Sequence, residues 1–175
     1  MKEAKEVIVK VAEPGDADAL VKLLECVRLE SDFITEDSQE QLTKSEMETF
    51  ISSSQLHDNC LCLLVMLDDE AIAVLNVAGK QDYSVSHIGD IFLAVKKSYW
   101  GCGLGQLLLA EAIDWAEHSG VIRRLELTVQ KRNQAALHIY QKHGFLLEGI
   151  KKRGARAQTG DFLDVCMMSK MIEGN

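Results

Sequence analysis

Apolar residues along the chain recur at two spacings, and each spacing predicts one kind of element. Alternating or continuous apolar runs bounded by turn residues predict strands, whereas apolar residues three and four apart predict helices. Strands are expected at 7–11, 61–67, 71–77, 88–95, 125–129, 145–153 and 162–171. Helices are expected at 17–30, 43–53, 106–117 and 133–142. The stretch 31–41 is polar apart from Phe33 and Ile34, and it predicts a loop or a short irregular helix.

Several helix features are specific enough to test. Asp16 is a candidate N-cap for the first helix, and Thr43 with Glu46 forms a capping-box pattern for the second. The buried stripe of the first helix is expected at Leu20, Leu23, Leu24 and Val27, and that of the third at Leu104, Leu107, Leu108, Ala112 and Trp115.

The order of the elements predicts one α/β domain over residues 1–175. Three antiparallel strands, 61–67, 71–77 and 88–95, follow one another through short turns. The helix at 106–117 then acts as a crossover, which makes strand 125–129 parallel to strand 88–95. A mixed, mostly antiparallel sheet with helices on both faces follows.

Composition narrows the classes of protein. A net charge of −8 argues against a duplex nucleic-acid binder and suits cationic, amine-bearing substrates. Neither a signal peptide nor an apolar run of membrane-spanning length is visible, and the five scattered cysteines suit reduced thiols, so a cytoplasmic protein is expected. His57 with Cys60 and Cys62 lacks a fourth ligand at the usual spacing, so no metal site is expected.

The strand at 88–95 leads through the glycine-rich turn 101–105 into a helix, which is a geometry suited to an anion. A tight turn without a ligand is one interpretation. A P-loop is disfavoured because Gln106-Leu107 follows the last glycine instead of Lys-Ser/Thr. A dinucleotide fingerprint fails in both frames, because its third glycine would fall at Gln106 or at Leu108.

Two spaced blocks resemble the GCN5-related N-acetyltransferase (GNAT) superfamily. The first is Trp100-Gly-Cys-Gly-Leu-Gly105, where the family pattern has Arg or Gln, two residues, and Gly-x-Gly/Ala. Trp100 departs from that pattern. The second block, from Asn133 through Tyr140 to Gly144-Phe145, is close to N-x-x-A-x-x-x-Y-x-x-x-G-F. The resemblance covers about 88–171 well and the first third in layout only.

The resemblance implies acetyl-CoA as cosubstrate, bound where strands 88–95 and 125–129 splay apart. Unpaired backbone groups at such a splay can bond the amides of pantetheine. The implied cofactor-binding residues are Leu93, Ala94 and Val95 on the strand, Gly101, Cys102, Gly103, Leu104 and Gly105 at the pyrophosphate, and the Asn133 side chain. A backbone N–H near Leu93 would polarise the thioester carbonyl and stabilise the oxyanion.

The implied reaction is direct attack of an acceptor amine on the thioester in a ternary complex. Tyr140 matches the family tyrosine that protonates the departing thiolate, and its alternative role is that of a core residue on a helix face. Asp90 is the candidate base, acting through a water molecule, and its alternative role is structural. Direct transfer needs no cysteine nucleophile, so Cys102 is not expected to react.

The acceptor stays open at this stage. The details around Asp90, Trp100, Gly149 and the 160–164 hairpin resemble bacterial members that act on ribosomal-protein N-termini, amino acids or small amines. A non-catalytic acyl-CoA-binding module is the alternative, and turnover with an amine separates the two. Family analogy suggests a homodimer.

Overall fold

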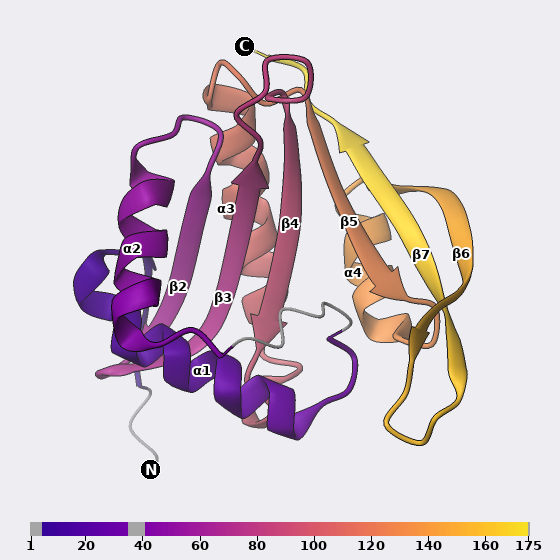
Figure 1. Ribbon diagram of the computed structural model, residues 1–175, viewed down its shortest axis with the longest axis horizontal. Helices are drawn as coiled ribbons and strands as arrows, with labels where there is room; N and C mark the ends of the chain where they lie inside the picture. The colour runs from indigo at the N-terminus through magenta and orange to yellow at the C-terminus, as the bar shows by residue number, and fades with distance from the viewer. Residues whose placement is uncertain (1–4, 35–40, 175) are drawn as a thin grey trace.

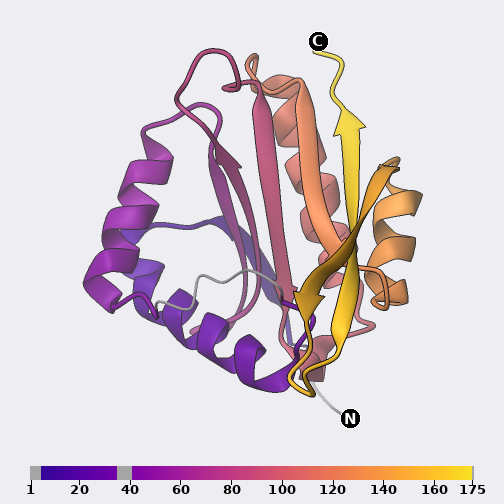
Figure 2. The same ribbon diagram turned by 45° about the vertical axis from the view of Figure 1, so that its right-hand side comes forward.

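The computed structural model describes residues 5–34 and 41–174, and it places a seven-stranded mixed sheet between two layers of helices (Figures 1 and 2). The strand order is β1-β2-β3-β4-β5-β7-β6. The strands are β1 (Val7–Val11), β2 (Leu61–Leu67), β3 (Glu70–Gly79), β4 (Ile88–Val95), β5 (Arg124–Gln130), β6 (Leu146–Arg156) and β7 (Phe162–Met171). The helices are α1 (Ala17–Glu30), α2 (Lys44–Gln55), α3 (Leu104–His118) and α4 (Gln134–Lys142).

Strands β4 and β5 form the parallel pair that the helix crossover predicts. They are paired over 88–90 and 124–126. Beyond this short ladder β4 continues to Val95 and β5 to Gln130, and the two strands diverge (Figure 1). β4 stays paired with β3 up to Val95. The second half of β4 is therefore bonded on its β3 side, while β5 moves away from its other edge.

The two helical layers bury different faces of the same strands. α1 and α2 cover one face of the sheet, and α3 and α4 cover the other (Figures 1 and 2). In β2, Leu64 packs in the core under α1 and α2, whereas Leu63 and Val65 belong to the core under α3. Because β2 is buried on both faces, its sequence is continuously apolar instead of alternating.

The capping box at the start of α2 is confirmed. The Glu46 N–H donates to Thr43 Oγ1 at 3.2 Å, and the Thr43 N–H donates to Glu46 Oε2 at 2.7 Å. Asp16 does occupy the N-cap position of α1, but its side chain makes no capping bond. Its carboxylate instead accepts the Glu13 N–H at 2.9 Å and pairs with Lys10 at 2.8 Å, so it fixes the turn that leads into the helix.

The predicted buried face of α3 is partly wrong. Leu104, Leu108 and Ala112 are buried as expected, but Leu107 is 38% exposed. The buried face also includes Leu109 and Ala116. At 3.6 residues per turn, Leu107 therefore points away from the centre of this face. In the predicted loop at 31–41, residues 35–40 lie outside the described part of the chain. None of the helices in residues 5–34 and 41–174 is long and apolar enough to cross a membrane.

Candidate active site

A pocket of about 360 Å³ lies where β4 and β5 diverge. Its walls come from the second half of β4, the end of β5, the turn before α3, the inner side of α4 and the chain that follows α1. The predicted site residues on its walls are Leu93, Ala94, Val95, Gly101, Gly103, Leu104, Gly105, Asn133 and Tyr140. Cys102 and Asp90 are not among the lining residues. The diverging strands therefore bring most of the sequence-predicted residues to one cavity.

The glycine-rich turn forms an open cradle at the start of α3. Gly101 and Gly103 have left-handed backbones, with φ of 76° and 80°, a conformation that glycine adopts without strain from a Cβ atom. A Cβ atom added to either would meet no described atom within 4 Å, so nothing crowds the backbone of the turn. The first-turn N–H groups of α3 and the helix dipole favour an anion at this end. The turn therefore has the open backbone and the helix start that an anion such as a pyrophosphate requires.

Trp100 ties this cradle to the end of β4. Its indole Nε1–H donates to the carbonyl oxygen of Val95 at 2.8 Å. Indole has a single donor, so this bond uses the only one that the side chain has. An Arg or Gln at the same position would retain donors for a phosphate. The departure from the family pattern at Trp100 thus removes a side-chain donor that an Arg or Gln would offer, and the donors that the turn retains are those of its backbone.

Tyr140 is both a buried residue and part of the pocket wall. It is 7% exposed, and burial raises the pKa of its phenol to about 12. Its ring packs against that of Phe145, with the centroids 5.9 Å apart. The two interpretations of Tyr140 from the sequence are therefore compatible, because a core position on α4 also presents this residue to the cavity.

Asn133 lies on the pocket wall at the start of α4. Its side-chain Oδ1 accepts the Ala136 N–H at 3.3 Å, which caps the helix. A side-chain bond from Asn133 to a ligand would therefore come from Nδ2, the amide's donor end. The same residue fixes the helix that carries Tyr140.

Asp90 is not on the pocket wall, and it is the last residue of β4 that pairs with β5. It is exposed, and Glu126 of β5 is its partner in the parallel ladder. Glu126 is in turn bonded to Arg124, with Nε and Oε2 2.9 Å apart. Alternation along β4 places Asp90 on the same face as Phe92, which packs under α1, whereas Leu93 packs under α3. The Asp90 carboxylate thus belongs to the α1 and α2 face of the sheet.

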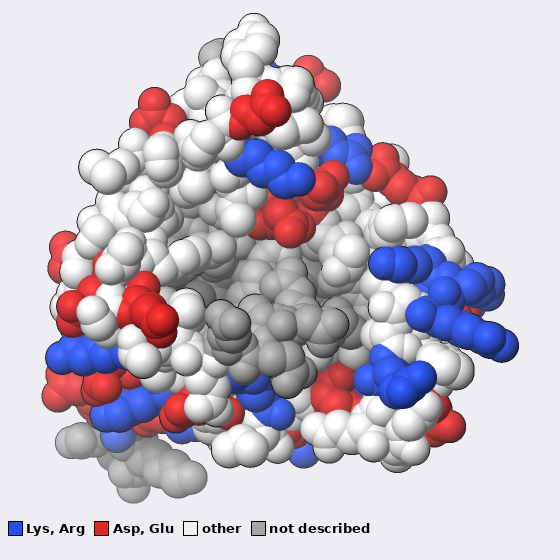
Figure 3. Space-filling view, viewed as in Figure 1, with Lys and Arg blue, Asp and Glu red and all other residues white. Residues whose placement is uncertain are grey.

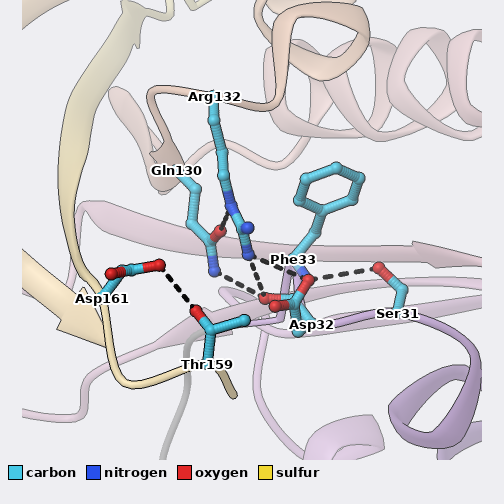
Figure 4. Close-up of polar contacts among 7 residues, drawn as sticks. All are labelled: Ser31, Asp32, Phe33, Gln130, Arg132, Thr159 and Asp161. Carbon is cyan, nitrogen blue, oxygen red and sulfur yellow. Dashed lines mark hydrogen bonds and ion pairs between the residues drawn. The ribbon is translucent and has the colours of Figure 1, made fainter. Parts of the chain in front are cut away.

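The chain after α1 supplies one wall of the pocket, which the layout of the first third predicts, through side chains that the sequence did not single out as site residues. Ser31, Phe33 and Ile34 line the pocket together with residues of β4 and the turn. Figure 4 shows that this segment is bonded to Gln130 and Arg132 at the end of β5. The isolated apolar pair Phe33-Ile34 within a polar stretch was the one sequence signal for this wall.

Charge is unevenly spread around this face. Basic side chains gather over β6 and β7, at the right of Figure 3, although the chain carries a net charge of −8. Lys151, Lys152, Arg153 and Arg156 of β6 are all exposed. Acidic side chains lie at the centre of the same view and along its opposite margin (Figure 3). A ligand that approaches this face therefore meets cations on the β6 side.

The sequence matches the family model described as Acetyltransferase (GNAT) family over residues 26–145. This span is more than half of the chain, so the chain belongs to the GNAT acetyltransferase family and is an acyltransferase that uses acetyl-CoA. The resemblance inferred from the two sequence blocks is confirmed.

Relatives agree with this assignment. A GNAT-family acetyltransferase from Streptococcus pneumoniae, known from its crystal structure, is 48% identical in sequence to this chain. The match covers 95% of this chain and 100% of the other, with a TM-score of 0.92. YncA from Salmonella typhimurium was solved with its cofactor acetyl-CoA. It is 16% identical, the match covers 97% of this chain and 96% of YncA, and the TM-score is 0.84. L-amino acid N-acetyltransferase AaaT from Escherichia coli K12 is 28% identical over 109 residues, 62% of this chain and 67% of its own.

Proposed function

We propose that the chain is an N-acetyltransferase that moves the acetyl group of acetyl-CoA to a primary amine by direct attack in a ternary complex. The observation that carries this proposal is one cavity with an uncrowded glycine cradle, the open edge of β4 and the Tyr140 phenol on its walls. Bound there, acetyl-CoA supplies the activated acyl group.

Different walls of the pocket would bind different parts of acetyl-CoA. The backbone amides of 101–105 would hold the pyrophosphate, because they lie at the start of α3 and the space at Gly101 and Gly103 is open. The open edge of β4 at Leu93 and Val95 would bond the two amides of the pantetheine arm. Asn133 Nδ2 would add a side-chain donor at the opposite wall.

The reaction requires that the chain stabilise the oxyanion, protonate the departing thiolate and accept a proton from the amine. A backbone N–H near Leu93 would stabilise the negative charge that develops on the thioester oxygen. The Tyr140 phenol would supply the proton that the departing thiolate takes up. Its pKa of about 12 keeps it protonated at neutral pH, so the proton is present when the thiolate forms.

Asp90 is the proposed general base, which accepts the proton of the amine. Its position outside the pocket wall requires a water molecule between its carboxylate and the amine. A carboxylate two residues before Phe92, on the face opposite α3, would also attract the cationic form of the acceptor to the α1 and α2 side of the sheet.

An amino acid is the acceptor class that we propose first. The relative AaaT is named as an L-amino acid N-acetyltransferase. An amino acid carries a carboxylate beside its amine, and exposed cations gather over β6 and β7 at one side of the face in Figure 3. Small amines without a carboxylate and peptide N-termini are the competing acceptors.

Cofactor binding is tested first by thermal unfolding with acetyl-CoA, with NADH and ATP as controls. At a hundredfold excess over Kd, binding adds about 2.7 kcal/mol, which is roughly 5–10 °C for a chain of this length. Thiol release is then measured over L-amino acids, their carboxamides, simple amines and short peptides. Faster turnover of amino acids than of their carboxamides is expected. Binding without turnover of any amine would favour a non-catalytic acyl-CoA-binding module.

A further inference from the structure

The chain that follows α1 is bonded to the end of β5 by a compact polar network (Figure 4). Gln130 Nε2 donates to the carbonyl oxygen of Asp32 at 2.8 Å, and Arg132 Nη2 lies 2.9 Å from Asp32 Oδ1. Arg132 Nε donates to Gln130 Oε1 at 2.7 Å, which joins the two side chains. Gln130 is 1% exposed. A buried amide with donor and acceptor both engaged fixes the position of the segment that it holds.

An aromatic contact continues from this network to the end of β4. The guanidinium of Arg132 lies 5.3 Å from the ring centroid of Phe33. Phe33 also lies near Trp100, with ring centroids 6.4 Å apart and planes inclined by 32°. Trp100 is fixed by its indole bond to Val95. Phe33 therefore bridges the ends of β5 and β4 at the place where these strands have separated.

Phe33 and Trp100 both line the pocket, together with the β4 residues Leu93 and Val95. A ligand arm that runs along β4 from the glycine cradle thus has the open edge of the strand on one side and two aromatic rings close by. The pantetheine arm of acetyl-CoA has amides that suit the strand edge, and methyl and methylene groups that suit aromatic rings.

We infer that Phe33 and Trp100 form an apolar wall that binds the pantetheine arm of acetyl-CoA, and that Arg132 and Gln130 are positioning residues that hold Phe33 in this wall. The inference rests on the proposed placement of the cofactor. Arg132 is assigned an indirect role because it is not among the residues that line the pocket, whereas Phe33 is, and because its Nε and Nη2 are engaged by Gln130 and Asp32.

The test compares two ligands by isothermal titration calorimetry. Acetyl-CoA carries the pantetheine arm, whereas adenosine 3′,5′-bisphosphate carries nucleotide phosphates without it. Phe33→Ala is expected to raise the Kd of acetyl-CoA about tenfold or more, as truncation of a central aromatic contact does. The Kd of adenosine 3′,5′-bisphosphate is expected to stay within about twofold of the wild-type value, and Phe33→Leu to give an intermediate effect on acetyl-CoA.

The role of Arg132 is tested by a double-mutant cycle with Phe33, in which the Kd of acetyl-CoA is measured. Arg132→Met is expected to weaken acetyl-CoA binding in the same direction, and Arg132→Lys, which keeps the charge pair with Asp32, to weaken it less. The double variant Phe33→Ala with Arg132→Met should bind no more weakly than Phe33→Ala alone, because the positioning residue has nothing left to position.

Arg123→Met is the matched control. The Arg123 guanidinium, like that of Arg132, is bonded to the backbone, with Nη1 donating to the carbonyl oxygen of Ile122 at 2.8 Å, but Arg123 precedes β5 and does not line the pocket. Its Kd for acetyl-CoA is expected to equal that of the wild type. Thermal unfolding without ligand shows whether each variant is folded, and Phe33→Leu and Arg132→Lys are the mild variants if the stronger ones unfold.

Three results would overturn the inference while leaving the proposed function in place. If Phe33 variants bind acetyl-CoA as tightly as the wild type, the apolar wall does not bind the pantetheine arm. Arg132→Met with an equal loss of affinity for adenosine 3′,5′-bisphosphate would show a direct phosphate contact instead. Additive effects in the double variant would remove the positioning role. A wild-type protein that binds no acetyl-CoA would contradict the proposed function itself and this inference with it.

Discussion

The ring of Tyr140 packs against the ring of Phe145, with centroids 5.9 Å apart and planes inclined by 59°. This contact fixes the phenol on the pocket wall from within the core. Tyr140→Phe keeps the packed ring and removes only the hydroxyl group. We expect kcat to fall by about 10²-fold, because a general acid contributes that much or more, while the Kd of acetyl-CoA changes little. Steady-state kinetics and calorimetry measure the two quantities.

Tyr99→Phe is the control for that variant, because Tyr99 also lines the pocket and is partly buried. Its kcat is expected to stay at the wild-type value. Full activity in Tyr140→Phe would assign Tyr140 to packing alone and leave protonation of the thiolate to solvent.

The raised pKa of Tyr140 also predicts the stability of the protein in alkali. The folded chain keeps this proton up to a pKa of about 12, whereas the unfolded chain loses it near 10. Between these values the unfolded state binds fewer protons, so the free energy of unfolding falls as pH rises. Tyr140→Phe lacks this group, and its melting temperature should therefore fall less than that of the wild type between pH 9 and 11. Parallel declines in the two proteins would contradict the burial of an un-ionised phenol.

The left-handed glycine at Gly103 is expected to matter for binding more than for stability. Gly103→Ala places a Cβ on a backbone with φ of 80°, which costs about 1 kcal/mol. It also projects a methyl group from the cradle, so we expect the Kd of acetyl-CoA to rise about tenfold or more. Gly120→Ala is the matched control, because Gly120 has φ of 74° at the other end of α3 and equally open space. It should lose similar stability and bind acetyl-CoA normally.

The sequence predicted the fold well because its signals are local. Periodicity set all seven strands and four helices to within a few residues, and the capping box at Thr43 and Glu46 marked the start of α2. The glycine cradle was predictable for the same reason, since Gly101 and Gly103 are two residues apart. Leu107 was misplaced because periodicity alone does not show which neighbours cover a helix.

The missed part of the site is non-local. Gln130 and Arg132 lie 98 and 100 residues after Asp32, and they meet it only because the folded chain brings the segment after α1 to the end of β5. One sequence contains no signal for that pairing. Trp100 was seen as a departure from the family pattern, but its bond to Val95 and its contact with Phe33 depend on the folded turn.

Cys102 offers a chemical probe of the cradle. It is exposed between two loop glycines, whereas Cys62 and Cys166 are buried, and burial raises the pKa of the Cys62 thiol to about 12. Iodoacetamide should therefore label Cys102 quickly and Cys62 very slowly. Saturating acetyl-CoA should slow labelling at Cys102 if the pyrophosphate occupies the neighbouring turn. Peptide mass spectrometry measures each rate, and equal rates at Cys102 with and without the cofactor would contradict this placement.

The role of Asp90 is tested by removing its charge without changing its size. Asp90→Asn cannot accept the proton of the amine, so kcat/KM at neutral pH is expected to fall about tenfold or more. Glu126→Gln is the control, because Glu126 is the ladder partner of Asp90 but is already paired with Arg124. We expect Glu126→Gln to retain the pH profile of the wild type. If Asp90→Asn keeps full kcat/KM while still binding acetyl-CoA, the proton leaves by another route and Asp90 is structural.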